Sequence, residues 1–200
     1  SHVLDTRQYR TDQRNGDGLK RPGKAANDPA ATMLGSIQRE WLFGELQKSR
    51  ATWNVLAQQV MMARVDRVPG PKEKCSMDQW PGYEVERQAI LKAFQDLKVS
   101  NPVVLTGDIH THWANELVSV PGRPDAPVVG TEFVCTSITS NSDGTERPNG
   151  MEEMMTENPF VKYHSGRRGY VSCEISDKTW RSDFRTVDFV TQKGAPLKTP

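Results

Sequence analysis

The sequence predicts a mixed α/β (α+β) fold, and two observations support this prediction. In the first half, helical and strand-like hydrophobic patterns alternate, which is typical of parallel strands with helices on their faces. From Glu116 onward, strand-like stretches follow one another with mainly Gly, Pro, Asn and Asp residues between them. This second pattern favours antiparallel strands along one edge of the sheet.

The first helix and the first long strand can be placed from their patterns. Ser36 is a candidate N-cap for a helix in which Ile37, Trp41 and Leu46 recur at near-helical spacing. The mostly apolar stretch Asn54–Met62 predicts a buried strand.

A second helix and a second strand follow. Residues 83–97 carry Val85, Ala89, Ala93 and Leu97 four positions apart, which predicts an amphipathic helix with these residues on its apolar side. The short apolar stretch Val103–Thr106 predicts the next buried strand.

The second half is predicted to be mostly β-structure. A hairpin turn is expected at residues 176–178 and a short helix at residues 151–156. The predicted strands cover residues 117–120, 131–136, 169–175 and 180–190.

Composition narrows the functional classes. The chain has 26 Lys and Arg against 25 Asp and Glu residues, so we expect no broad basic surface for nucleic acid. No apolar stretch is long enough to span a membrane, and no signal peptide opens the chain.

The polar composition of residues 11–30 predicts a long surface loop. We expect Cys135 and Cys173 to be buried in strands and Cys75 to be exposed.

A possible metal-binding motif follows the strand Val103–Thr106. Gly107 allows a sharp turn, and Asp108, His110 and His112 come directly after it. Carboxylate oxygen and imidazole nitrogen together suit iron, manganese or zinc, whereas calcium favours the oxygen. Alternatively, the Asp caps a turn and the histidines are solvated.

The motif resembles the Gly-Asp-x-His motif of PhoD-like alkaline phosphatases and phosphodiesterases, within the calcineurin-like metallophosphoesterase superfamily. Further stretches resemble that family in the same order along the chain. They are Leu4–Arg10, Met33–Leu42, Trp53–Val60, Asp78–Tyr83 and Arg168–Val171. The resemblance therefore covers nearly the whole chain.

The resemblance implies an architecture. It implies a four-layer α/β/β/α sandwich, with residues 1–200 as the C-terminal half of a single domain. The family's N-terminal half supplies a Cys, an Asp followed by a Tyr, and an Asn as further metal ligands, and these motifs do not precede Ser1. We therefore expect the missing half to complete the site, and export to the periplasm or outside the cell.

The resemblance also implies a chemistry. It assigns Asp108 and His110 as metal ligands, with Asp108 on a calcium-type site and His110 on an iron-type site. The implied cofactors are Ca²⁺ and Fe³⁺, and other divalent metals remain alternatives. A two-metal centre neutralises phosphoryl oxygens and makes a water nucleophilic, which is what hydrolysis of a phosphate-ester substrate requires.

Five further residues are weaker candidates. His112 either contacts substrate at the rim as a proton donor or is a solvated loop residue. Gln58 and Gln59 are either oxygen ligands or second-sphere groups, or they hydrogen-bond across the sheet. Arg7 and Arg10 suit bidentate phosphate binding, or they lock a loop through ion pairs in which Asp5 could take part.

Three functional hypotheses follow from the sequence. The first is a metal-dependent phosphomonoesterase or phosphodiesterase of which this chain carries part of the site. The second is a catalytically inactive fragment, and the third is a module that keeps the fold and binds a phosphorylated ligand. The substrate itself, whether monoester, phospholipid, nucleotide or polymer, stays open.

Overall fold

The computed structural model describes residues 1–120, 123 and 125–200, and it contains a six-stranded sheet with the order β1-β3-β5-β7-β6-β8. Strands β1, β3, β5 and β7 run parallel, whereas β6 pairs antiparallel with both β7 and β8. The predicted mixture of directions is therefore confirmed. In chain order the strands are β1 His2–Val3, β3 Asn54–Ala57, β5 Pro102–Thr106, β6 His112–Val118, β7 Val128–Val134 and β8 Val161–Ser165.

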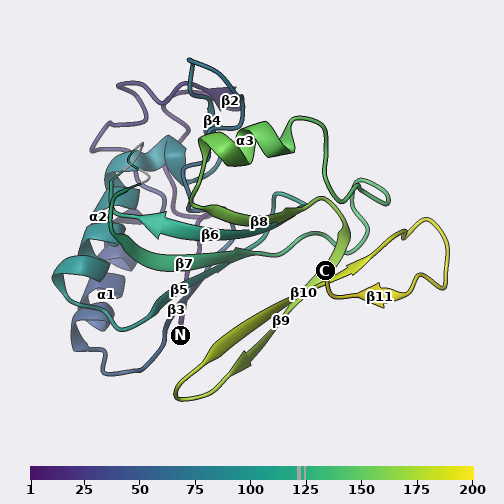
Figure 1. The fold of residues 1–200 in the computed structure, drawn as a ribbon. Coiled ribbons are helices and arrows are strands. Elements are labelled where there is room, and N and C mark those ends of the chain that lie inside the picture. Colours follow the sequence, from purple (N-terminus) through teal and green to yellow (C-terminus); the bar gives the residue numbers. More distant parts are fainter. Residues whose placement is uncertain (121–122, 124) are drawn as a thin grey trace.

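Two helices, α1 Gly35–Lys48 and α2 Glu84–Asp96, lie together beside the sheet (Figure 1). The main hydrophobic core includes apolar residues of both helices and of the central strands. Its members include Leu42, Leu46, Ile90, Leu91, Phe94, Leu56, Val104 and Val134.

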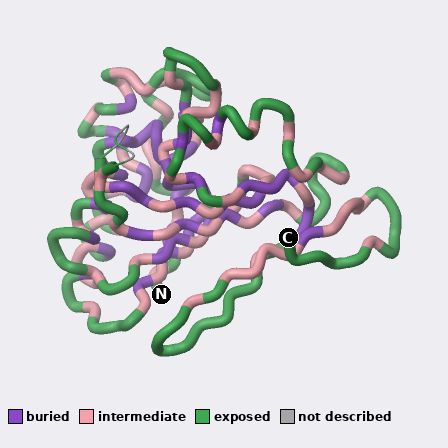
Figure 2. The backbone as a smooth tube through the Cα atoms, in the orientation of Figure 1, coloured by how far each residue is buried: buried purple, intermediate pink, exposed green. Residues whose placement is uncertain are grey.

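A second, three-stranded sheet is built on a long hairpin that projects from the body of the molecule (Figure 1). Its strands are β9 Arg168–Ile175, β10 Trp180–Val187 and β11 Leu197–Lys198. The predicted turn is confirmed, since the amide of Ser176 donates to the carbonyl of Thr179 at 2.9 Å. Figure 2 shows that this hairpin is mostly exposed or intermediate, in contrast to the buried strands of the large sheet.

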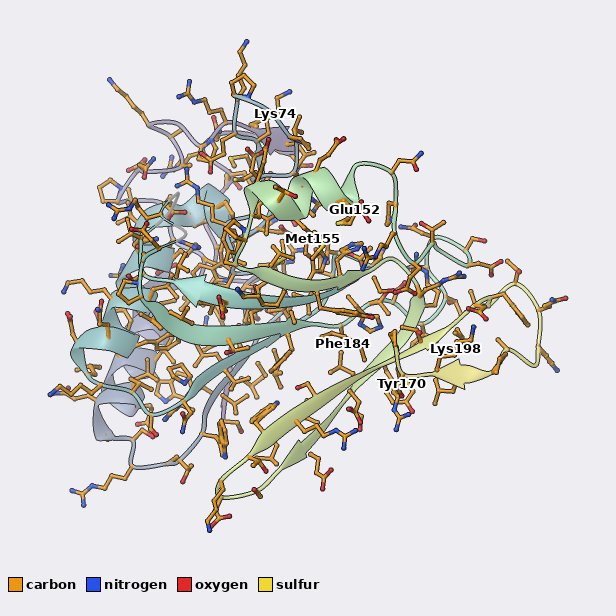
Figure 3. All side chains as sticks on the ribbon, in the orientation of Figure 1. Lys74, Glu152, Met155, Tyr170, Phe184 and Lys198 are labelled. Atoms are coloured by element: carbon orange, nitrogen blue, oxygen red, sulfur yellow. The ribbon has the colours of Figure 1, made fainter. Side chains whose placement is uncertain are left out.

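Aromatic side chains connect the hairpin to the large sheet. The Phe184 ring lies 4.6 Å from that of Tyr163 on β8 and 6.2 Å from that of Phe133 on β7, measured between centroids. Figure 3 shows Phe184 between β10 and the large sheet. Trp180 packs near Phe133 and Trp53. The rings therefore hold the hairpin against the large sheet at two places, midway along β10 at Phe184 and beside the turn at Trp180.

The remaining elements are short. Strands β2 Leu19–Lys20 and β4 Cys75–Ser76 pair antiparallel, so the predicted surface loop 11–30 contains one short strand. A 3₁₀ helix, η1 Trp80–Tyr83, precedes α2, and the predicted short helix is α3 Met151–Glu157. None of the helices in the described part of the chain has the length and apolar character needed to cross a membrane.

The predicted start of the first helix is wrong, and of its predicted apolar residues only Leu46 is buried. Leu34, not Ser36, occupies the N-cap position, and the side chains of Ile37 and Trp41 are 84% and 45% exposed. The helix start is fixed by two contacts. The Glu86 carboxylate accepts hydrogen bonds from the backbone amide of Leu34 (3.1 Å) and from the amide before it, and the Thr32 hydroxyl accepts from the amide of Gly35 at 2.8 Å. A tertiary and a local contact therefore cap the helix together.

The predicted apolar side of the second helix is also wrong. Val85 and Leu97 are exposed, whereas Glu84, Glu86 and Arg87 are buried. Burial of these charges is compensated by polar contacts: Arg87 Nη1 lies 2.9 Å from Glu84 Oε1, and Arg87 Nε donates to the carbonyl of Met62 at 2.7 Å. Hydrophobic spacing cannot indicate such a polar inner side.

Two smaller predictions are corrected. Strand β3 ends at Ala57 instead of Met62, because the Gln58 amide bonds the backbone of Val60 and turns the chain out of the sheet. The expected burial is reversed for two cysteines, since Cys75 is buried and Cys173 is exposed, whereas Cys135 is half-buried.

Candidate functional site

The loop after β5 presents the predicted metal ligands at the carboxyl end of that strand. The amide of Gly107 donates to the carbonyl of Gln59 at 3.2 Å, and the amide of Ile109 donates to Gly107 at 2.8 Å. Asp108 and His110 both have left-handed backbone conformations, with φ of 70° and 60°. Alternating left-handed residues bend the loop back on itself, so that it turns tightly between β5 and β6.

Left-handed backbone is concentrated around this loop. Non-glycine residues avoid positive φ for steric reasons, although Asn, Asp and His tolerate it best. The described residues with positive φ other than glycine are Asp108, His110, Asn141 and Ser142, together with Lys98 and Asn101 elsewhere. Four of these six lie on the two loops that meet at His110, and such conformations gather at functional sites.

Arg7 connects the N-terminal segment to the loop. Its Nη2 donates to Asp108 Oδ1 at 3.0 Å, and its Nη1 donates to Asp78 Oδ2 at 2.8 Å. Arg10 donates to the other oxygen of Asp78 at 2.9 Å. The two predicted phosphate-binding arginines therefore lie side by side on one carboxylate.

The partner of the arginines differs from the one considered in the sequence analysis. The Asp5 carboxylate accepts from the backbone amides of Arg7 and Gln8, at 2.9 and 2.8 Å, and so closes a turn. Asp78 forms the ion pairs instead. Partial burial disfavours its charge, but the two guanidinium groups outweigh this effect and lower the pKa of Asp78.

Gln59 joins the two segments that carry Arg7 and Asp108. Its backbone carbonyl accepts from the amide of Gly107. Its side-chain oxygen accepts from the amide and the hydroxyl of Thr6, at 2.8 and 2.7 Å, and its nitrogen donates to Leu4 at 3.0 Å. This is a supporting role close to the candidate ligands.

Gln58 lies deeper in the structure. Its side-chain oxygen accepts from the amide of Val60 at 3.0 Å and from the indole of Trp80 at 3.2 Å. Its side-chain nitrogen donates to the carbonyl of Val60. These bonds use both ends of the amide, and a ligand role for Gln58 stays a prediction.

The rim position expected for His112 is wrong. His112 is the first residue of β6 and is fully buried, with its ring 5.2 Å from that of Phe184. Its Nδ1 accepts from the amide of Thr136 at 3.3 Å. Burial lowers the pKa of His112 to about 4, so the ring is neutral near pH 7. Contact with a substrate would require access that this ring lacks.

The donors at the loop fit one side of a metal centre. Asp108 offers a carboxylate on a side chain that is 40% exposed, and His110 offers an imidazole two residues away. Within residues 1–120, 123 and 125–200, no group of three or more His, Cys, Asp or Glu residues is placed to hold a metal. A complete set of metal ligands would need further donors.

Comparison with known proteins identifies the family. A family model described as PhoD-like phosphatase matches residues 1–184. The chain belongs to the PhoD-like phosphatase family. It is 40% identical over 198 residues to alkaline phosphatase D of Bacillus subtilis (strain 168), covering 99% of this chain and 34% of that protein. A solved structure described as the structure of PhoD matches with a TM-score of 0.95 at 40% identity, covering 98% of this chain and 38% of that one.

The structural match confirms the predicted mixed α/β fold class, because this PhoD-like chain shares the arrangement of the solved structure. It spans about a third of the length of the curated relative.

Two further residues belong to this candidate site, and the sequence alone assigns neither of them a partner. Asn141 and Arg168 both contact His110, across 31 and 58 positions of sequence. Arg168 opens the predicted motif Arg168–Val171, but nothing in that motif indicates its target, because the contact is to a backbone carbonyl.

Proposed function

We propose that the protein carrying this chain hydrolyses phosphoric esters at a metal centre to which Asp108 and His110 contribute ligands. The observation that carries this proposal is the left-handed loop after β5, which presents the Asp108 carboxylate to Arg7 and carries the His110 imidazole two residues further on. Membership of the PhoD-like phosphatase family supports the reaction class.

Arg7 and Arg10 are proposed to bind the phosphoryl group of the substrate. A guanidinium presents a fork of N–H donors that matches two phosphoryl oxygens. Asp78 holds both side chains from one side and orients them. Arg7 can therefore exchange its contact with Asp108 for a phosphoryl oxygen while it stays anchored to Asp78.

The proposed cofactors are Ca²⁺ and Fe³⁺, with other divalent metals as alternatives. The Asp108 oxygen suits calcium, and the His110 nitrogen suits iron. Bound metal ions would supply charge neutralisation and an activated water for in-line displacement. The residues of this chain orient the ester: Arg7 and Arg10 fix its phosphoryl oxygens, and Gln59 keeps the segment of Arg7 beside the loop of Asp108.

Further ligands are proposed to come from a preceding half of the same domain, and the protein is proposed to be secreted or periplasmic. The first proposal rests on the two donors of this loop and on the length of the curated relative. The second rests on the family resemblance alone.

The proposal is tested by hydrolysis of a chromogenic phosphodiester, bis(p-nitrophenyl) phosphate, with calcium and iron supplied. The assay compares this chain with the full-length protein that contains it. Asp108→Asn removes one charge at the site, whereas Asp177→Asn makes the same change at the exposed hairpin turn. We expect the full-length Asp108→Asn protein to lose at least a hundredfold in rate and the Asp177→Asn control to retain full activity.

The other outcomes separate the alternatives. Equal activity of the full-length protein and its Asp108→Asn variant would overturn the assignment of the site. Activity confined to the full-length protein would identify this chain as an inactive part of the enzyme. Absence of activity in both, with retained binding of inorganic phosphate, would favour a phosphate-binding module.

A further inference from the structure

We propose that Asn141 is a positioning residue that fixes the tautomer of the His110 imidazole, while Arg168 holds the backbone of both loops in place. This inference rests on the proposed function, because it concerns the same metal-binding loop. It adds a requirement on the protonation of the ring. A histidine binds a cation only through a nitrogen that carries no proton, so the tautomer of His110 decides which nitrogen can bind.

The His110 ring and the Asn141 side chain face each other across two loops. Asn141 Nδ2 lies 3.2 Å from His110 Nδ1. Asn141 and the next residue, Ser142, both have left-handed backbone, with φ of 64° and 60°. The loop is tightened further by the Ser137 hydroxyl, which donates to the carbonyl of Ser140 at 3.0 Å. The amide therefore approaches the ring from a fixed direction.

Arg168 fastens the two loops to one another. This side chain is buried, and its Nη1 donates to the carbonyl of His110 and to the Ser137 hydroxyl, the latter at 3.0 Å. Its Nε donates to the carbonyl of Ser142 at 2.9 Å. The Thr136 hydroxyl also donates to the carbonyl of His110, at 2.9 Å. One guanidinium thus sets the spacing between the backbone of His110 and the loop of Asn141.

No carboxylate in the described part of the chain forms an ion pair with Arg168. Burial lowers the pKa of Arg168. What the arginine supplies is its planar fork, which reaches two backbone carbonyls at once. A lysine would carry the charge without that geometry.

The amide of Asn141 can present either end to the ring. With Nδ2 toward Nδ1, the amide donates, and the proton of the neutral imidazole sits on Nε2. Turned by 180°, Oδ1 accepts from Nδ1–H and leaves a lone pair on Nε2. A metal-binding histidine usually donates its second ring N–H to an oxygen in this way. The ligand role of His110 therefore selects the second arrangement.

The tautomer can be measured directly by ¹⁵N NMR of histidine-labelled protein at pH 8. The chain has four histidines, and a His110→Gln variant assigns the signals of His110. We expect the Nδ1–H pattern at His110, its loss in Asn141→Ala, and its retention in Asn141→Asp, where a carboxylate accepts the same bond. Asn149→Ala, at another exposed loop position, is the matched control.

An Nε2–H pattern in the unmodified chain, or a pattern that is the same in Asn141→Ala, would overturn the inference. Zn²⁺ titration of the full-length protein gives a second readout: we expect Asn141→Ala to weaken affinity about 10-fold to 100-fold and Asn141→Asp to restore it. The two proposals fail separately. A tautomer that depends on Asn141 in a protein without hydrolytic activity would retain this inference and reject the proposed function.

Discussion

Asp78 is the residue on which both phosphate-binding candidates depend. It accepts from Arg7, from Arg10 and from the Gln13 amide, the last at 2.7 Å. We expect Asp78→Asn to lower the free energy of unfolding by about 1–2 kcal/mol at pH 7, because two guanidinium groups lose their counter-charge. Urea unfolding measures the change, and Asp12→Asn, at an exposed neighbouring position, should change it by less than about 0.5 kcal/mol.

The pH dependence of the same variant checks the cause. Because the pKa of Asp78 is lowered in the folded state, its stabilising effect is present above the unfolded pKa of about 4 and is lost as pH falls through the lowered value. The difference between the natural protein and Asp78→Asn should therefore disappear at low pH. A difference that stays constant down to pH 2 would contradict the ion-pair explanation.

At the scale of single residues, the sequence predicts groups whose chemistry is local and misses those that act through backbone. Asp108 and His110 could be proposed as ligands because a short motif contains both. The contacts of Asn141 and Arg168 could not be predicted, because their partners are a ring and carbonyl oxygens far away in sequence. The inward side of α2 was missed because Glu84 and Arg87 satisfy one another only after the chain has folded.

At the scale of elements, the hairpin of β9 and β10 depends on Gly169. A Cβ at this position would lie 1.8 Å from the carbonyl oxygen of Arg185 on the paired strand, and φ is 153°. We expect Gly169→Ala to lower the free energy of unfolding by more than about 2 kcal/mol and to speed amide hydrogen exchange in both strands.

Gly44→Ala is the control for that substitution. Gly44 lies in α1, where an added Cβ meets no heavy atom within 4 Å. Alanine is the better helix former by about 1 kcal/mol, so this variant should be neutral or slightly more stable. Similar destabilisation by both substitutions would rule out the steric clash as the cause.

Elements were predicted better than their boundaries. Strand β5 was found almost to the residue, because a short apolar stretch between polar turns has few alternatives. Strand β8 was missed, since the sequence around Tyr163 and His164 is polar and aromatic and its pairing with β6 is irregular. Pairing with a neighbouring strand can stabilise a strand that the local sequence pattern does not indicate.

At the scale of the whole molecule, two buried histidines predict a loss of stability in mild acid. Burial lowers the pKa of both His112 and His164 to about 4. Between pH 6.5 and 4 the unfolded chain binds protons that the folded chain does not, so stability falls as pH falls through this range. From pH 7 to pH 5 each histidine should cost about 2 kcal/mol.

Urea unfolding of a His164→Phe variant tests this prediction. Phenylalanine keeps a ring against Trp113, whose centroid lies 4.4 Å from that of His164, but it cannot bind a proton. The loss of stability between pH 7 and pH 5 should fall by about half in the variant. Buried Glu132, whose pKa is raised and whose effect has the opposite sign, is common to both proteins and cancels. An unchanged loss would assign the acid sensitivity to other groups.

The contacts that Gln59 makes between separate segments have a consequence for how the molecule folds. The N-terminal segment, the turn after β3 and the loop after β5 converge there, and Arg168 adds a fourth segment from the far end of the chain. Each contact closes a long stretch of chain. The chain therefore loses conformational entropy before the contact stabilises it. Helices α1 and α2 can begin to form from local contacts, whereas the site requires all of these closures. We therefore expect the site to be completed late in folding, after the helices have begun to form.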